Sequence, residues 1–548
     1  MRARGWLLLL VSLAAGALFF GSLHLLWPLV DTDLTRPADE VRAEARRHLE
    51  SLGFDLDGYR AASRLRIDGA VLDYVDRAFG REQTQAWVRE GSSLVYYRVL
   101  FKKRGESIGY VVRLHPSGNV IAWSKSIDAD HEGARLPVEQ ARRIASRLLD
   151  ETFALDPGTV EETSVETREE SDLRAHTFGY ERLLSAEPEL RERITITVAG
   201  DEPTFGSRYW LQPPAARREA RARQAPRIAL ETVGFLLAAV SGIAAIFIFL
   251  RHLRDGSVQL GRAAVWPAIV FVCLMATFML EGASLVAYWE PLWPLWVSAF
   301  RYFFERAGQQ VWLVLFLLAL VAAGNALDGK LGAGRGNSLA LAGRGKLLHP
   351  SVALASGRGF LIGLCCGGTL SLAVLAVGWL TGGGTSLQPR GFFLYSLNSA
   401  SPAITSLLFF LGVALAEELG YRYFGGSWLL QLTGSRWLAI LLPGLIYGLT
   451  HTRMDFLPPA DPFWARALVL TLVGCVWGWA FLRYDALTVV LSHFTADLFI
   501  FNWPRLASGE TLPVVSSLAT LAVPLLPAIL FAICSAAGRA GPRPRPAS

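Results

Sequence analysis

The chain has 548 residues, of which 52% are hydrophobic and 18% are charged, and its formal net charge is +6. A mean hydropathy of +0.34 is too high for an ordinary soluble protein of this length, so that class is excluded. Lysine and arginine lie mostly in short loops and in one polar region, not in a basic stripe interleaved with aromatic residues. We therefore predict a protein of the lipid bilayer with no nucleic-acid partner.

Long apolar segments recur along the chain. Runs of about 18 or more apolar residues with few charges are typical of membrane helices. The sequence predicts eight to ten spans, because the seventh, eighth and ninth segments vary in length and are interrupted by polar residues. We expect an all-α polytopic membrane protein with one inserted α+β domain. The apolar segments are 6–30, 228–250, 263–280, 311–327, 360–380, 404–416, 438–449, 467–481, 486–491 and 512–536.

The distribution of basic residues predicts the orientation of the chain. The connection 328–358 holds five lysine or arginine residues and one acidic residue, which places it in the cytoplasm by the positive-inside rule. The polar region 31–225 is then extracytoplasmic, in a multi-pass protein that we expect in a bacterial plasma membrane. Basic residues beside other spans agree with this orientation: Arg2, Arg4, Arg251, Arg254 and Arg262.

Five regions follow from the spans. The first apolar run is longer than the core of a typical signal peptide and lacks a clear cleavage site, so we predict an uncleaved anchor. The regions are an N-terminal transmembrane anchor (1–30), an extracytoplasmic domain (31–225), transmembrane helices that include the basic connection (226–399), a helical core (400–502), and a last transmembrane helix with a basic tail (503–548).

The polar region contains an internal duplication. Residues 36–57 match residues 136–156, with Pro37 aligned to Pro137, and each copy has apolar residues at helical spacing after the proline. Three strand-like runs follow in each copy, such as "LVYYRVLF" in the first and "RITITVAG" in the second. We expect a helix packed on a small antiparallel sheet, twice. This pattern resembles a pair of PepSY-type modules.

Charged and polar side chains are concentrated in the apolar segment 404–500. A charge within a membrane costs several kcal/mol unless it is paired or hydrated, so such residues are candidates for function. Only nine histidines occur in the whole chain, and two of them lie at the ends of apolar runs here. The residues are Glu417, Glu418, Arg422, His451, His493 and Asp497.

Helical geometry allows these residues to meet. From Glu417 to Gly434 a helix would span roughly 25 Å, and the return from a turn at Gly434–Ser435 to His451 spans roughly 21 Å. Two antiparallel helices would therefore bring His451 to the depth of Glu417. Three pairs are spaced four residues apart and share a helix face: Glu418 with Arg422, Tyr447 with His451, and His493 with Asp497.

This set of side chains is suited to the activation of water. Glu417 could act as a general base, while Glu418 and Arg422 satisfy each other as an ion pair. An imidazole could stabilise an oxyanion. Alternatively, Glu417, His451 and His493 could bind a divalent metal such as zinc. No "HExxH" motif occurs in the chain, which excludes the common zinc-protease helix.

Three motifs in order resemble the CPBP family of intramembrane proteases, which includes the type II CAAX prenyl endopeptidases and the Abi-type proteins. "EELGYR" fits E-E-x-x-x-R, "YGLTH" fits an aromatic residue four before a histidine, and "HFTAD" fits H-x-x-x-[N/D]. The resemblance covers about residues 400–502. It implies an all-helical membrane core, a CPBP-type protease core, that hydrolyses peptide bonds.

The resemblance also implies roles for single residues. Glu417 would activate water that His451 helps to hold, while His493 and Asp497 would stabilise the oxyanion or complete the site. Asp497 replaces the asparagine that is usual in the prenyl endopeptidases, and a carboxylate is a poorer oxyanion donor but a better metal ligand. Three further residues would be structural or orient the substrate: Glu418, Arg422 and Tyr447. Both a metalloprotease and a glutamate-type protease stay open.

Three classes of function fit the sequence. The first is an intramembrane endopeptidase acting on membrane-associated protein or peptide substrates, with the outer domain regulating it or capturing substrate. The second is a non-catalytic membrane scaffold or accessory protein that keeps the motif. The third is a proton- or ion-coupled transporter, which would usually show inverted repeats among its spans, and none is found in the sequence.

Overall fold

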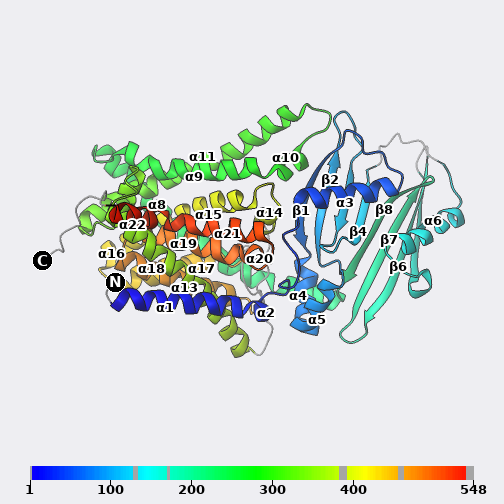
Figure 1. Cartoon of the computed structure of the whole chain (residues 1–548), viewed down its shortest axis with the longest axis horizontal. Coiled ribbons are helices and arrows are strands. Elements are labelled where there is room, and N and C mark those ends of the chain that lie inside the picture. Colours follow the sequence, from blue (N-terminus) through cyan, green and yellow to red (C-terminus); the bar gives the residue numbers. More distant parts are fainter. Residues whose placement is uncertain (1–2, 127–133, 170–172, 382–391, 454–461, 538–548) are drawn as a thin grey trace.

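The computed structural model describes residues 3–126, 134–169, 173–381, 392–453 and 462–537. Arg2 and the predicted basic tail, 538–548, lie outside these ranges. Figure 1 shows a helical bundle at one end of the molecule and a twisted sheet with its helices at the other. The start of α1 and the helix α22 lie at the end of the bundle away from the sheet.

The bundle confirms the polytopic membrane class. Within the described ranges, 7 helices are long and apolar enough to cross a membrane, and three shorter apolar helices run beside them. Together they coincide with the ten apolar segments of the sequence. The bundle helices are α1 (Ala3–Gly21), α8 (Gln224–Arg254), α9 (Leu260–Leu280), α11 (Leu295–Leu331), α13 (Pro350–Thr381), α15 (Pro402–Glu418), α16 (Ser427–Thr433), α17 (Arg436–Thr450), α18 (Ala465–Arg483), α19 (Ala486–Phe501), α21 (Thr511–Ala522) and α22 (Leu526–Ala536).

Short elements join or extend the bundle helices. The turn predicted at Gly434–Ser435 is present: Gly434 has a positive φ of 69° and Ser435 caps the start of α17. The short elements are α2 (Leu23–Leu26), α7 (Pro214–Ala222), α10 (Gly282–Tyr288), α12 (Asn337–Gly343), α14 (Phe392–Leu397), η2 (Leu419–Gly426), α20 (Trp503–Leu506) and η3 (Val523–Leu525).

Small residues allow the helices of the core to approach closely. A Cβ atom added to Gly444 on α17 would lie 2.8 Å from Cys475 Sγ on α18, and one added to Gly363 on α13 would lie 2.6 Å from the carbonyl oxygen of Ser492 on α19. Both distances are shorter than real Cβ contacts. Close backbone approach of this kind is a main source of helix association in membranes. These contacts hold α17 against α18 and α13 against α19.

The inserted domain is built on one sheet of eight antiparallel strands in the order β1-β2-β3-β4-β8-β7-β6-β5. Helix α3 packs against the half formed by β1 to β4, and helix α6 packs against the half formed by β5 to β8 (Figure 1). The strands are β1 (Arg60–Ile67), β2 (Val95–Lys102), β3 (Tyr110–Leu114), β4 (Val120–Lys125), β5 (Glu161–Glu169), β6 (Arg174–Ser185), β7 (Leu190–Ala199) and β8 (Glu202–Leu211). The helical elements are α3 (Ala38–Ser51), α4 (Gly69–Phe79), α5 (Arg81–Arg89), α6 (Val138–Glu151) and η1 (Pro157–Thr159).

The two halves of the sheet domain correspond to the two sequence repeats. Pro37 and Pro137 precede α3 and α6, which have 14 residues each. Each half contributes a helix and four antiparallel strands, and the halves meet where β4 pairs with β8. The prediction of two small, separate sheets is therefore corrected to one continuous sheet.

Each repeat also has one strand more than predicted. The additional strands are the two edge strands, β1 and β5. Strand β5 has the sequence "EETSVETRE" and is exposed along its length, so it lacks the alternating apolar pattern that marks a half-buried strand. Charged side chains of this kind are typical of edges that must not pair with another chain.

The sheet domain is bound to the bundle through β1 and β2. Arg64 of β1 forms an ion pair with Glu281, at 3.1 Å between Nη2 and Oε1, and Glu281 directly precedes α10. Lys102 of β2 donates a hydrogen bond from Nζ to the carbonyl oxygen of Trp289 at 2.6 Å. The sheet therefore lies against the ends of the bundle helices that are remote from the start of α1 and from α22 (Figure 1).

A buried histidine makes the stability of the sheet domain dependent on pH. His115 is 2% exposed, and its Nδ1 accepts a hydrogen bond from the backbone N–H of Ser117 at 3.0 Å. Burial lowers the pKa of His115 to about 4, from 6.5 for the free side chain. The neutral form is thus favoured in the folded state. The contribution of His115 to the free energy of unfolding is present above pH 6.5 and is lost as the pH falls toward 4.

We expect the variant His115→Asn, which retains an acceptor but does not titrate, to lose stability less steeply on acidification than the unchanged protein. The difference in the free energy of unfolding between the variant and the unchanged protein should change by about 2 kcal/mol between pH 7.5 and pH 5. Thermal unfolding of both proteins at the two pH values measures it. Parallel pH profiles would contradict the prediction.

Candidate active site

The two glutamates lie in the last turn of α15, immediately before a π-helical segment. Helix α15 ends at Glu418, and η2 continues from Leu419 to Gly426 with the wider turn of a π-helix before α16 begins. Such segments are rare and frequently occur at functional sites. The spacing in the sequence predicted a continuous helix here, so this change of helical winding was not foreseen.

Glu418 and Arg422 form an ion pair that is almost completely buried. Arg422 Nη1 donates to Glu418 Oε1 at 3.0 Å, and both side chains are 1% exposed. The second amino group, Nη2, donates to the carbonyl oxygen of Gly474 on α18 at 3.1 Å. The pair therefore connects η2 to α15 and α18 and places a paired positive charge inside the bundle.

Aromatic rings surround the guanidinium group of Arg422. Its central carbon lies 4.8 Å from the ring centre of Tyr447, 5.3 Å from that of Trp477 and 5.5 Å from that of Tyr421. Cations over aromatic faces are attracted by the ring quadrupole, and the attraction is larger where water is excluded. These rings offset part of the cost of burying the charge.

The same carboxylate oxygen also orients His493. Nδ1 of His493 lies 2.8 Å from Glu418 Oε1, and the imidazole stacks on the indole of Trp477 with ring centres 4.0 Å apart. Because a carboxylate accepts, Nδ1 is the protonated nitrogen. Nε2 then points to the other side, 3.8 Å from Glu417 Oε2 and 3.5 Å from Asp497 Oδ2.

His451 is oriented in a similar way by a backbone carbonyl. Its Nδ1 lies 2.7 Å from the carbonyl oxygen of Tyr447, one helical turn earlier, and donates a hydrogen bond to it. Nε2 is therefore directed to Glu417, with 3.4 Å between Nε2 and Oε1. The Nε2 atoms of His451 and His493 thus converge on the carboxylate of Glu417 from two helices.

Glu417 borders a cavity of about 180 Å³ with mainly apolar walls. Its Oε2 atom is buried and makes no hydrogen bond to another described residue. Its lining residues are Phe409, Phe410, Val413, Glu417, Tyr447, His451, Arg466, Leu470, His493, Asp497 and Phe501.

A second cavity, of about 620 Å³, is also lined by Glu417. It lies between α8, α11, η2 and α17, and its walls are mostly leucine, valine, alanine and phenylalanine side chains. Glu417 therefore lies between a small cavity that contains both imidazoles and a larger apolar one.

The residues predicted for catalysis are together in one place. Glu417, His451, His493 and Asp497 line the small cavity, together with Tyr447, which was predicted to be structural or to orient the substrate. Glu418 and Arg422 do not reach it and lie behind His493. The geometry thus separates the predicted residues into those that face the cavity and those that support them, while their chemical roles stay predictions.

Two residues of the site were not singled out from the sequence. Trp477, which stacks on His493, was not distinguished because an aromatic residue in an apolar span is usually part of the core. Arg466 stands at the start of an apolar span, where a charge is common, yet it lines the cavity and donates to the carbonyl oxygen of Thr452 at 3.3 Å. Asp455 and Asp461 lie outside the described ranges.

A divalent metal at this site stays a prediction. Glu417, His451 and His493 offer one carboxylate and two imidazoles whose Nδ1 atoms are engaged, which is the usual state of histidines that bind a metal through Nε2. In the described part of the chain, however, no group of three or more histidine, cysteine, aspartate or glutamate side chains is arranged to hold a metal ion. Zinc therefore stays a prediction, and the chemistry proposed below uses the side chains alone.

The fold and the site define a multi-pass membrane protein with a carboxylate between two imidazoles inside its helical bundle. Residues 399–499 match the family model described as type II CAAX prenyl endopeptidase Rce1-like, so this part of the chain is similar to that family. The match confirms the resemblance drawn from the three motifs. The PepSY-type interpretation of the sheet domain stays a prediction. No curated protein and no solved structure matches the chain.

Removing Arg422 should destabilise the whole protein. The variant Arg422→Met leaves Glu418 buried without its cationic partner, which costs about 3–5 kcal/mol. The matched variant Arg453→Met breaks a pair with Glu231 in which the arginine side chain is 52% exposed, and it should cost about 1 kcal/mol or less. Unfolding of both variants in detergent, by heat or denaturant, compares them. Equal stability of the two variants would contradict the structural role of the buried pair.

Proposed function

We propose that the chain is an intramembrane endopeptidase that hydrolyses peptide bonds in membrane-associated protein or peptide substrates. The observation that carries this proposal is the buried, unpartnered Oε2 of Glu417 at a cavity where two imidazole Nε2 atoms converge. A buried carboxylate oxygen without a hydrogen bond is costly; Oε2 of Glu418 is another, but of the two acids only Glu417 borders the cavity, where water or a substrate can reach it. This favours catalysis over a scaffold or a transporter.

In the proposed reaction, Glu417 acts as the general base. A water molecule held between its carboxylate and Nε2 of His451 loses a proton to the carboxylate, while the water oxygen attacks the carbonyl carbon of the peptide bond. The tetrahedral intermediate collapses as the C–N bond breaks, and Glu417 returns the proton to the leaving amine. A positioned acid–base group of this kind typically accelerates a reaction by about 10²–10⁴-fold.

His493 and Asp497 are assigned to the oxyanion. His493 is held at Nδ1 by Glu418, and in its doubly protonated form it can donate a hydrogen bond from Nε2 to the developing negative charge. Asp497, 3.5 Å from that nitrogen, stabilises the charged imidazole. The site then needs no amide at position 497, which is where the related endopeptidases usually carry asparagine.

The larger apolar cavity that Glu417 lines supports a substrate that enters from the bilayer. Its walls lack the polar groups that a soluble peptide would need, since its lining contains few polar side chains besides Glu417. An extended segment of a membrane-associated chain could reach the carboxylate there without crossing water.

Glu417→Gln should abolish cleavage without changing the amount of folded protein. The amide cannot accept the proton of water, so the rate of peptide cleavage in reconstituted membranes should fall by about 100-fold or more. Glu510→Gln, a change of the same kind at an exposed position before α21, is the control and should cleave at the unchanged rate. Residual cleavage by the Glu417 variant at a similar rate would rule out the glutamate-base mechanism.

We further propose that the sheet domain lies outside the cytoplasm of a bacterial cell and captures or regulates substrates. Its attachment beside α10, through Arg64 and Lys102, supports this role because it places the sheet over one end of the bundle. Replacing both residues by methionine should change the relative rates at which a short peptide and a full-length membrane substrate are cleaved. Limited proteolysis shows whether the attachment of the sheet domain is weakened in the variant. If it is weakened and the ratio of the two cleavage rates is unchanged, the proposed role is contradicted.

A further inference from the structure

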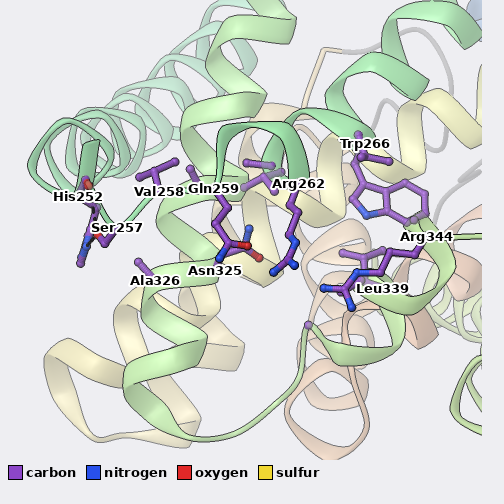
Figure 2. Close-up of a pocket in the computed structure, with 17 residues that line it drawn as sticks. His252, Ser257, Val258, Gln259, Arg262, Trp266, Asn325, Ala326, Leu339 and Arg344 are labelled. Carbon is purple, nitrogen blue, oxygen red and sulfur yellow. Dashed lines mark hydrogen bonds between the residues drawn. The ribbon is translucent and has the colours of Figure 1, made fainter. Parts of the chain in front are cut away.

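A polar cavity of about 290 Å³ lies at the end of the bundle away from the sheet domain. It is enclosed by α9, α11, α12 and the connection between α8 and α9, and none of the residues assigned to catalysis lines it. Figure 2 shows its side chains, which come from separate elements and surround a common space. The cavity therefore needs an explanation of its own.

Two arginines give the cavity a positive charge. Arg262 extends from the first turn of α9 and Arg344 from the end of α12, and both side chains border the cavity beside Asn325 of α11 (Figure 2). Both arginines are exposed, and neither forms an ion pair with a carboxylate in the described part of the chain. Two guanidinium groups that share one cavity repel each other unless an anion lies between them.

Further donors and an apolar wall complete the cavity. The amide of Gln259 and the indole of Trp266 line it together with valine, alanine and leucine side chains of α9, α11 and α12. Trp266 lies near the start of a membrane helix, a position typical of the boundary between headgroups and hydrocarbon. The cavity thus combines a positive charge with a tryptophan, and both are typical of the headgroup region.

We propose that this cavity binds the phosphate of an anionic phospholipid headgroup. The guanidinium group suits phosphate because its planar N–H donors match two phosphate oxygens at once. Basic pockets between transmembrane helices are a recurrent way to bind anionic headgroups, and under the predicted orientation this end of the bundle lies in the cytoplasmic leaflet. The apolar walls favour a lipid over a free phosphate, since the acyl chains can follow the exposed apolar side of α9, where Leu260 is 44% exposed.

The cavity is connected to the helix segment that supports the site. Asn325, which lines the cavity, accepts a hydrogen bond at its Oδ1 from the hydroxyl group of Tyr423 at 2.6 Å. Tyr423 lies on η2, next to Arg422. A lipid held in the cavity therefore contacts a residue that fixes η2. Any effect of the lipid on cleavage rests on the proposed function, whereas its binding does not.

Native mass spectrometry of the full-length protein in a neutral detergent tests the binding. Phosphatidylglycerol is compared with phosphatidylcholine that carries the same acyl chains, and the anionic lipid should be retained at lower concentration. The double variant Arg262→Gln and Arg344→Gln should lose about tenfold or more of its affinity for phosphatidylglycerol. The double variant Arg251→Gln and Arg254→Gln is the control, because it removes the same charge from exposed positions at the same end of the bundle that do not line the cavity.

The proposal is overturned if the unchanged protein binds both lipids equally, or if the two double variants lose affinity to the same extent, which would indicate surface charge alone. Inorganic phosphate is the competing probe. If it displaces phosphatidylglycerol at millimolar concentration, the cavity takes free phosphate and the lipid assignment is wrong. If phosphatidylglycerol analogues displace the bound lipid and inorganic phosphate does not, the assignment of the cavity to a lipid headgroup is supported. None of these readouts requires proteolysis, so a failure here is distinct from a failure of the proposed activity.

Discussion

A single carboxylate oxygen, Oε1 of Glu418, accepts hydrogen bonds from both Arg422 and His493, and the rest of the site depends on it. The charge of Glu418 is tolerable inside the bundle only because Arg422 is beside it, and the charge of Arg422 only because of Glu418 and the surrounding rings. The pair fixes which nitrogen of His493 carries the proton. That choice directs Nε2 to the cavity and to Glu417, so a structural ion pair determines the chemistry of its neighbour.

The close packing of α17, α18 and α19 turns this local arrangement into a site. Glycines at the helix contacts bring the backbones together, so that Trp477 can stack on His493 while the carbonyl oxygen of Tyr447 holds His451. Two imidazoles are thereby oriented by different partners toward one carboxylate. Glu418 binds Arg422 and His493 through Oε1 and does not line the cavity, whereas Glu417 borders it, and this difference gives the adjacent acids separate tasks.

Much of this arrangement could be predicted from the sequence. Charges in an apolar segment are costly enough to mark a site, and spacings of four residues show which side chains share a helix face. The helical repeat in the polar region was also visible, because Pro37 and Pro137 precede the same pattern.

Other features have no local signal in the sequence. The π-helical winding of η2 depends on its surroundings, the aromatic partner of His493 resembles an ordinary core residue, and the union of two half-sheets depends on the pairing of β4 with β8. The edge strand β5 is too polar to show an alternating pattern. The basic cavity at the end of the bundle away from the sheet domain combines Arg262 and Arg344. These residues are far apart in the chain and meet only in the fold.

The most direct test of the central claim compares two adjacent substitutions, Glu417→Gln and Glu418→Gln, in the same membranes. Thermal unfolding and the rate of peptide cleavage are measured for both. The account predicts that the Glu417 variant unfolds like the unchanged protein and does not cleave, while the Glu418 variant unfolds at a clearly lower temperature because Arg422 loses its partner. A Glu417 variant that still cleaves, or a Glu418 variant with unchanged stability, would contradict it.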